Sequence, residues 1–184
     1  PDSSLLTFHT MLRGICLLAA TLFLSLNAGA AELIFDFTTT PVGKTPEGLK
    51  PMLIGNGPEP VWQVLQDDAP SAFAPLTSKG SSTTKAAVLA QTSTDGTDER
   101  YPVILNEGDY FGDFTFTTKF KLVSGTKERM AGIVFRAQDQ YNFYVLRASG
   151  LGNTFRFYKV VGGTRQPPIG PEISLPSGVW HEMS

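Results

Sequence analysis

Period-two alternation of apolar and polar residues recurs every dozen or so residues after residue 31, and no window there has a convincing helical period. The clearest alternation spans residues 113–122, where Phe and Leu fall on one side and mostly Thr and Lys on the other. Such a pattern is typical of a strand with one buried and one solvated face. The other segments predicted as strands are 33–37, 62–66, 86–91, 103–105, 131–137, 143–148, 154–161 and 179–183.

Turn-forming residues separate these segments, and the chain has 18 Gly and 13 Pro. Short strands joined by frequent turns predict an all-β sandwich or barrel. Residues 40–60, which include several Pro and Gly, are predicted to form a long surface loop after the first strand.

The best-defined local unit is a predicted hairpin with arms at 133–136 and 143–147. Asp139 and Asn142 suit its turn, because their side chains can bond the nearby backbone. The register stays open at this level, because a shift of one residue moves every side chain to the opposite face.

Two pairings of Arg136 are considered. If Arg136 lies opposite Phe143, both share a face with Arg147. If it lies opposite Tyr144, Arg136 and Tyr144 lie together instead.

The N-terminal segment has the pattern of a secretory signal peptide at residues 11–30. Met11 and Arg13 precede an apolar run at 15–26, and small residues at 27–31 predict cleavage after Ala30 or the next residue. The run is shorter than the ~20 residues that span a bilayer, so we expect no stable membrane insertion after cleavage. Residues 1–10 are expected to lie upstream of the start.

The single cysteine, Cys16, lies inside this signal, so residues 31–184 contain none. Disulfides, thiolate metal sites and cysteine nucleophiles are therefore excluded from that segment. An exported bacterial protein, periplasmic or extracellular, fits this pattern. The net charge of −2, from 15 basic and 17 acidic side chains, does not indicate nucleic acid or an anionic membrane as a partner.

The order of several motifs resembles that of concanavalin A-like domains, and is most similar to bacterial secreted proteins of the laminin-G-like and 3-keto-disaccharide hydrolase families. The motifs are Gly132-Ile133-Val134-Phe135-Arg136, Asp139 with Asn142, Phe143-Tyr144-Val145-Leu146-Arg147, Phe155-Arg156-Phe157-Tyr158-Lys159, Gly162-Gly163 and Gly178-Val179-Trp180-His181.

This resemblance implies a two-sheet antiparallel jelly-roll sandwich whose concave face is the usual place for sugar. Domains of this kind commonly continue with more strands after Trp-His. We therefore expect residues 31–184 to form one domain that is truncated at its C-terminus.

Candidate catalytic groups are few. Glycoside hydrolysis usually needs two carboxylates about 5–10 Å apart. The acidic pairs at 67–68, 98–99 and 107 with 109 all occur in turn-like sequence, which favours solvated turn carboxylates. His181 is expected to pack at a strand end beside Trp180 rather than to serve a zinc site or a catalytic triad.

No cofactor is predicted, although residues 95–99 could offer oxygen ligands to a structural calcium ion. A plain loop is favoured there, because the strict calcium-loop spacing is absent.

Sugar binding requires aromatic faces that stack on pyranose rings and polar side chains that bond hydroxyls. Two functions remain open: an exported hydrolase of glycosides or 3-keto-disaccharides, and a non-catalytic carbohydrate-binding or cell-surface recognition module. The predicted substrate-binding residues are Arg136, Tyr144, Arg147, Arg156 and Tyr158. For each of these arginines, the alternative is an outward-facing side chain whose stem covers apolar surface.

Overall fold

The computed structural model describes residues 32–71 and 82–184. The predicted signal peptide and the residues upstream of it lie outside these ranges. The chain divides into Pro1–Ile34 and Phe35–Ser184, and the fold described below is that of the second unit. Within the described ranges, no helix has the length and apolarity needed to cross a bilayer.

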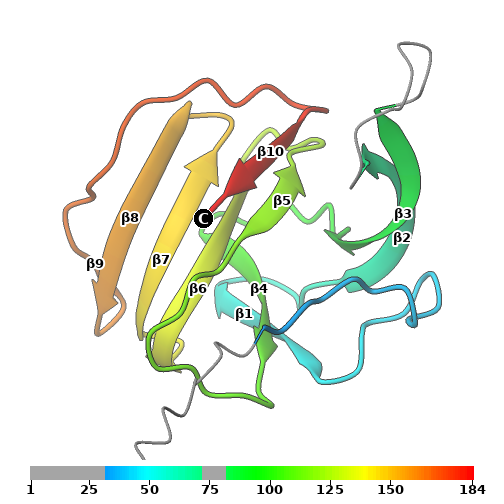
Figure 1. Cartoon of the computed structure of the whole chain (residues 1–184). Helices are drawn as coiled ribbons and strands as arrows, with labels where there is room; N and C mark the ends of the chain where they lie inside the picture. The colour runs from blue at the N-terminus through cyan, green and yellow to red at the C-terminus, as the bar shows by residue number, and fades with distance from the viewer. Residues whose placement is uncertain (1–31, 72–81) are drawn as a thin grey trace, which may run out of the picture. The chain divides into compact units, whose positions relative to one another are not determined.

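The described residues form an all-β fold, as the alternation predicts, and every strand pairing is antiparallel. Three two-stranded ribbons pair β1 with β4, β2 with β3, and β5 with β10, and a four-stranded sheet has the order β6-β7-β8-β9 (Figure 1). The strands are β1 (Leu49–Gly55), β2 (Trp62–Pro70), β3 (Thr83–Gln91), β4 (Arg100–Asn106), β5 (Thr118–Lys121), β6 (Met130–Asp139), β7 (Asn142–Ser149), β8 (Thr154–Val161), β9 (Thr164–Arg165) and β10 (Trp180–Met183).

The turn between β6 and β7 is fixed by side-chain hydrogen bonds. The backbone N–H of Tyr141 donates to Asp139 Oδ1 over 2.7 Å, and Asn142 Nδ2 donates to both carboxylate oxygens of Asp139 over 3.0 Å. Asn142 Oδ1 in turn accepts the N–H of Gly162 in the next turn. The predicted role of Asp139 and Asn142 in this turn is confirmed.

The main core lies between the β5 and β10 ribbon and one face of the four-stranded sheet, so that two β layers pack face to face (Figure 1). Each large apolar side chain buried there contributes about 1.5–3 kcal/mol. The buried members of this cluster are Leu122, Ala148, Leu175 and Met183.

The other side of the β5 and β10 ribbon contacts β2. Trp180 Nε1 donates to the backbone oxygen of Asp68 over 2.8 Å, and Lys121 pairs with the carboxylate of Asp67. These contacts connect residues more than 50 positions apart, which ties the β2 and β3 ribbon to the two-layer core.

Four sequence predictions are wrong. Residues 33–37 are not a strand, because Asp36 Oδ1 accepts both the N–H and the hydroxyl of Thr38 and Phe37 is left-handed at φ 57°. The predicted loop at 40–60 contains β1, which pairs with β4. The strand at 113–122 is reduced to β5, and Asp67 and Asp68 lie within β2 rather than in a turn.

The remaining strand predictions are confirmed to within a few residues at their ends, and that of β8 is confirmed at both ends. His181 also behaves as predicted, since its ring lies 5.4 Å from that of Phe120 and its Nε2 is 3.2 Å from the carbonyl oxygen of Pro176.

Candidate functional site

The two faces of the four-stranded sheet carry different chemistry. The pairing of Tyr144 with Phe135 and of Leu146 with Ile133 and Phe157 places these apolar side chains on one face, called here the hollow face. The residues that alternate with these along the same strands lie on the opposite face, called here the arginine face. It carries the polar side chains of Arg147, Arg156, Tyr158 and Arg165, together with Gly132 and the apolar residues Val134, Phe143, Val145 and Val160.

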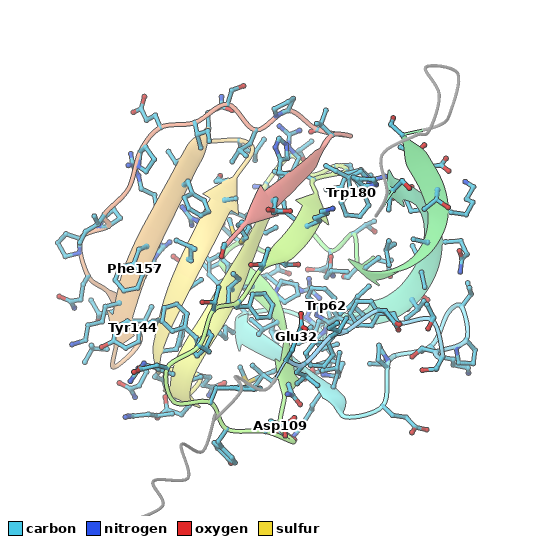
Figure 2. The ribbon with its side chains drawn as sticks, viewed as in Figure 1. Glu32, Trp62, Asp109, Tyr144, Phe157 and Trp180 are labelled. Atoms are coloured by element: carbon cyan, nitrogen blue, oxygen red, sulfur yellow. The ribbon has the colours of Figure 1, made fainter. Side chains whose placement is uncertain are left out.

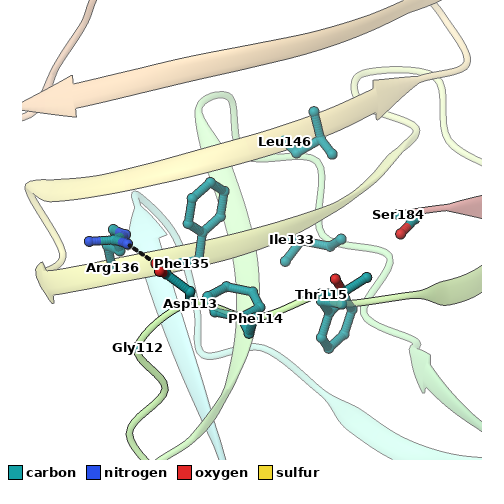
Figure 3. A pocket seen from close by; sticks show the side chains of 10 residues that line it. Gly112, Asp113, Phe114, Thr115, Ile133, Phe135, Arg136, Leu146 and Ser184 are labelled. Atoms are coloured by element: carbon teal, nitrogen blue, oxygen red, sulfur yellow. Dashed lines mark ion pairs between the residues drawn. The ribbon is translucent and has the colours of Figure 1, made fainter. Parts of the chain in front are cut away.

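A hollow of about 480 Å³ lies on the hollow face, between β6, β7 and the irregular segment that precedes β5 (Figure 3). Phe114 and Phe116 line it from that segment, while Phe135 and Leu146 line it from the sheet. The volume falls within the ~300–1,000 Å³ usual for small-molecule sites. Its walls are therefore mostly aromatic and aliphatic.

A compact cluster of aromatic side chains, called here the aromatic row, adjoins this hollow. Phe114 meets Phe135 edge-on at 6.2 Å between ring centroids, and Phe135 stacks on Tyr144 at 5.7 Å. Tyr144 then stacks on Phe157, also at 5.7 Å, and Figure 2 shows these last two rings side by side on β7 and β8. All except Phe114 are half-buried, so the row presents partly exposed ring surface beside the hollow.

A charged pair lies at the edge of the hollow. The strand β6 is bulged between Phe135 and Asp139, and within the bulge Arg136 has a left-handed backbone at φ 50°. This conformation, which costs a non-glycine residue about 1–2 kcal/mol, interrupts the alternation of side chains. Arg136 consequently lines the hollow beside Phe135, with its Nη2 3.7 Å from Asp113 Oδ1 (Figure 3).

The observed register differs from both pairings considered for Arg136. Phe135 lies opposite Tyr144, so a regular strand would set Arg136 opposite Phe143 and on the face of Arg147. The bulge prevents this, and brings Arg136 to the face that carries Tyr144.

The five predicted binding residues are thus divided between two faces. Arg136 lines the hollow and Tyr144 belongs to the aromatic row, whereas Arg147, Arg156 and Tyr158 lie together on the arginine face. No single site in the described part of the chain combines all five.

The arginine face is organised around Arg147. Its Nη2 donates to the hydroxyl of Tyr158 over 2.8 Å, and its guanidinium carbon lies 4.8 Å from the centre of that ring. Arg156 lies directly opposite Arg147 in the β7 and β8 pairing. Arg165 extends over the ring of Tyr101 from β4 at 6.0 Å, and burial raises the pKa of that phenol.

Sequence reasoning missed several residues of the hollow. Phe114 and Phe116 were assigned to a buried strand face, yet they are 45% and 41% exposed. Asp113 and Phe135 were not singled out for binding, although both line the hollow. The period-two run of Phe at 114 and 116 is the available signal, but nothing local reveals that no described strand pairs with this segment.

Residues 95–99, which were considered as possible calcium ligands, use carboxylates for hydrogen bonds within the loop. Asp95 Oδ1 accepts the N–H of Thr97 over 2.9 Å, and hydrogen bonds from Thr97 hold the pKa of Asp95 below its usual value. Buried Arg100 extends to within 3.8 Å of the same oxygen. Among residues 32–71 and 82–184, no three His, Cys, Asp or Glu side chains are grouped as metal ligands. The expectation of a plain loop at residues 95–99, with no cofactor, stays a prediction.

Comparison of the chain with protein-family models, with curated proteins and with solved structures gives no match. Its function is therefore argued from the geometry of the two faces.

Proposed function

We propose that this chain is an exported carbohydrate-binding protein that holds a saccharide in the hollow and along the aromatic row. The observation that carries the proposal is the combination of aromatic side chains with a charged pair, Arg136 and Asp113, at one concave site.

The aromatic part suits the apolar faces of sugar rings. Pyranose rings present C–H groups on one face, which pack against the partly exposed faces of aromatic side chains. The ring centroids of Phe135, Tyr144 and Phe157 lie 5.7–6.3 Å from one another, so the three rings form one compact aromatic patch beside the hollow.

The charged part suits hydroxyl groups. A guanidinium donates several hydrogen bonds and a carboxylate accepts them, so adjacent hydroxyls can bond Arg136 and Asp113 at once. Both side chains are exposed, and an ion pair of that kind contributes at most about 1 kcal/mol to stability. The left-handed backbone of Arg136 is accordingly better explained by a binding role than by the pair itself.

The wider proposal includes a concanavalin A-like jelly roll and a periplasmic or extracellular location. The two-layer antiparallel packing supports the fold, and the signal-peptide pattern at residues 11–30 supports export. We favour binding over hydrolysis. A hydrolase uses two carboxylates, and the described residues that line the hollow contribute only Asp113.

The test is a glycan array of neutral oligosaccharides probed with the full chain, followed by titration of the best ligand. We expect binding that weakens at least tenfold in Arg136→Ala. Lys127→Ala is the matched control, because Lys127 is exposed and no hydrogen bond or ion pair is seen for it among the described residues. This substitution should leave the affinity unchanged.

A hydrolysis assay on the same ligand separates the two functional classes. If the protein releases a hydrolysis product and Asp113→Asn abolishes that release, the protein is a hydrolase rather than a non-catalytic binding module. Absence of binding to every saccharide, or equal affinity in the Arg136→Ala and control variants, would overturn the proposal.

A further inference from the structure

The arginine face gathers positive charge that no described carboxylate neutralises through an ion pair. Arg147 and Arg156 lie directly opposite each other on β7 and β8, where side chains start about 4.5–5.5 Å apart. Arg165 adds a third guanidinium from β9, opposite Val160 and two residues along β8 from Tyr158. Like charges placed in this way destabilise a sheet unless something compensates them.

No carboxylate performs that compensation in the described residues. Every ion pair formed there by an arginine involves Arg100 or Arg136, and neither belongs to this face. Glu99 and Glu128 are near enough to influence the pKa of Tyr101, but neither forms an ion pair with these arginines. The three guanidinium groups are therefore left without an anionic partner within the described part of the chain.

The hydrogen-bonding capacity of these groups is also mostly unused. Arg147 makes one side-chain hydrogen bond, to Tyr158, and its buried Nε has no partner. The hydroxyl of Tyr158 accepts that bond and so keeps its own proton available to donate. Arg156 is half-buried, and no side-chain hydrogen bond is seen for it among the described residues.

Gly132 is the partner of Arg147 on β6. A Cβ atom at residue 132 would lie 2.5 Å from the backbone oxygen of Leu146, so only glycine fits this close pairing. Gly132 is exposed and has no side chain that could cover the β6 side of Arg147.

We infer that the arginine face binds an oxyanion, a carboxylate or a sulfate carried by a small ligand, between Arg147 and Arg156 and within reach of the Tyr158 hydroxyl. Planar guanidinium groups bind such oxyanions through paired N–H donors. This site lies on the opposite face of the sheet from the hollow, so the inference does not rest on the proposed function.

The experiment is an NMR titration of the full chain with sodium sulfate and, separately, with sodium glucuronate, at constant ionic strength set with chloride. Shifts are expected at the arginine Nε–Hε signals and at backbone amides of residues 145–147 and 154–158. Binding of both anions assigns a general oxyanion site, and a response to glucuronate alone assigns a carboxylate site.

Variants identify the residues responsible. Arg156→Gln is expected to raise the dissociation constant of the anion at least tenfold. Arg156→Lys should restore only part of the lost affinity, because an ammonium cannot form the paired donor fork. Arg147→Gln should behave like Arg156→Gln. Lys127→Gln removes one exposed positive charge elsewhere and is expected to leave the dissociation constant of each anion unchanged.

Circular dichroism of each variant checks that it is folded, and Arg156→Gln provides the test should Arg147→Gln not fold. The inference is overturned if neither anion shifts these signals at tens of millimolar. It is equally overturned if both anions bind Arg156→Gln as tightly as the Lys127→Gln control.

Discussion

Truncation of Phe135 tests whether the hollow and the aromatic row are one packed unit. The ring of Phe135 contacts those of Phe114, Tyr144 and Phe157 at 5.7–6.3 Å, more partners than any other aromatic side chain described. Removing a fully buried Phe side chain costs about 3–5 kcal/mol. Because Phe135 is half-buried, we expect Phe135→Ala to lower the free energy of unfolding by about 2–3 kcal/mol.

Urea unfolding followed by the fluorescence of the two tryptophans measures this change. Phe111→Ala is the matched control, because Phe111 is 55% exposed and contacts one ring, that of Phe114. Its loss should stay below about 1 kcal/mol. Equal losses in the two variants would show that the row is not a packed unit and would refute the reasoning from ring contacts.

Three further predictions concern the sheet, its turn and the contact with β2. Gly132→Ala should destabilise the fold by about 1–3 kcal/mol, seen as a lower urea midpoint, since its Cβ would lie 2.5 Å from a carbonyl oxygen of β7; an unchanged midpoint would contradict the pairing. Hydrogen bonds from the Asn142 side chain, and then from the backbone, lower the pKa of Asp139, so its stabilisation is complete above about pH 4 and is lost as the pH falls through the folded-state pKa. Asp139→Asn should therefore flatten the fall in stability between pH 5 and pH 2, and an unchanged pH profile would be evidence against this role. Trp180→Phe removes the hydrogen bond to Asp68 and should cost about 0.5–1.5 kcal/mol in thermal unfolding, whereas no change would show that the contact with β2 is not stabilising.

The strands of the four-stranded sheet could be predicted because each is locally consistent. Residues 154–161 are rich in aromatic and β-branched side chains and are bounded by glycine-containing turns, so β8 needs no distant information to be recognised. The same holds for the turn at Asp139 and Asn142, in which Asp139 accepts hydrogen bonds from the backbone N–H of Tyr141 and from the Asn142 side chain, both within three residues.

The errors arise where structure depends on distant partners or on a single backbone angle. β1 contains Pro51 and forms because β4, about 50 residues away, supplies its hydrogen bonds. Residues 113–117 alternate as a strand does, but no described strand pairs with them. The bulge at Arg136 reverses the face of one side chain, which decides the content of the hollow and has no signature in composition or periodicity.

The division of the predicted site follows from the same cause. Once the register is known, strict alternation along β7 sends Tyr144 and Arg147 to opposite faces, so residues close in sequence cannot share one ligand. The sequence pattern indicated which residue types could bind sugar, whereas the pairing of β6 with β7 determined which of them meet.

The most direct measurement is chemical-shift mapping of backbone amides during titration of the full chain with the best neutral oligosaccharide from the array. Binding in the hollow predicts shifts at residues 112–116, 133–136 and 144–146, and their loss in Arg136→Ala. Shifts confined to Arg147, Arg156, Tyr158 and Arg165 on the arginine face, or none at saturating saccharide, would contradict it.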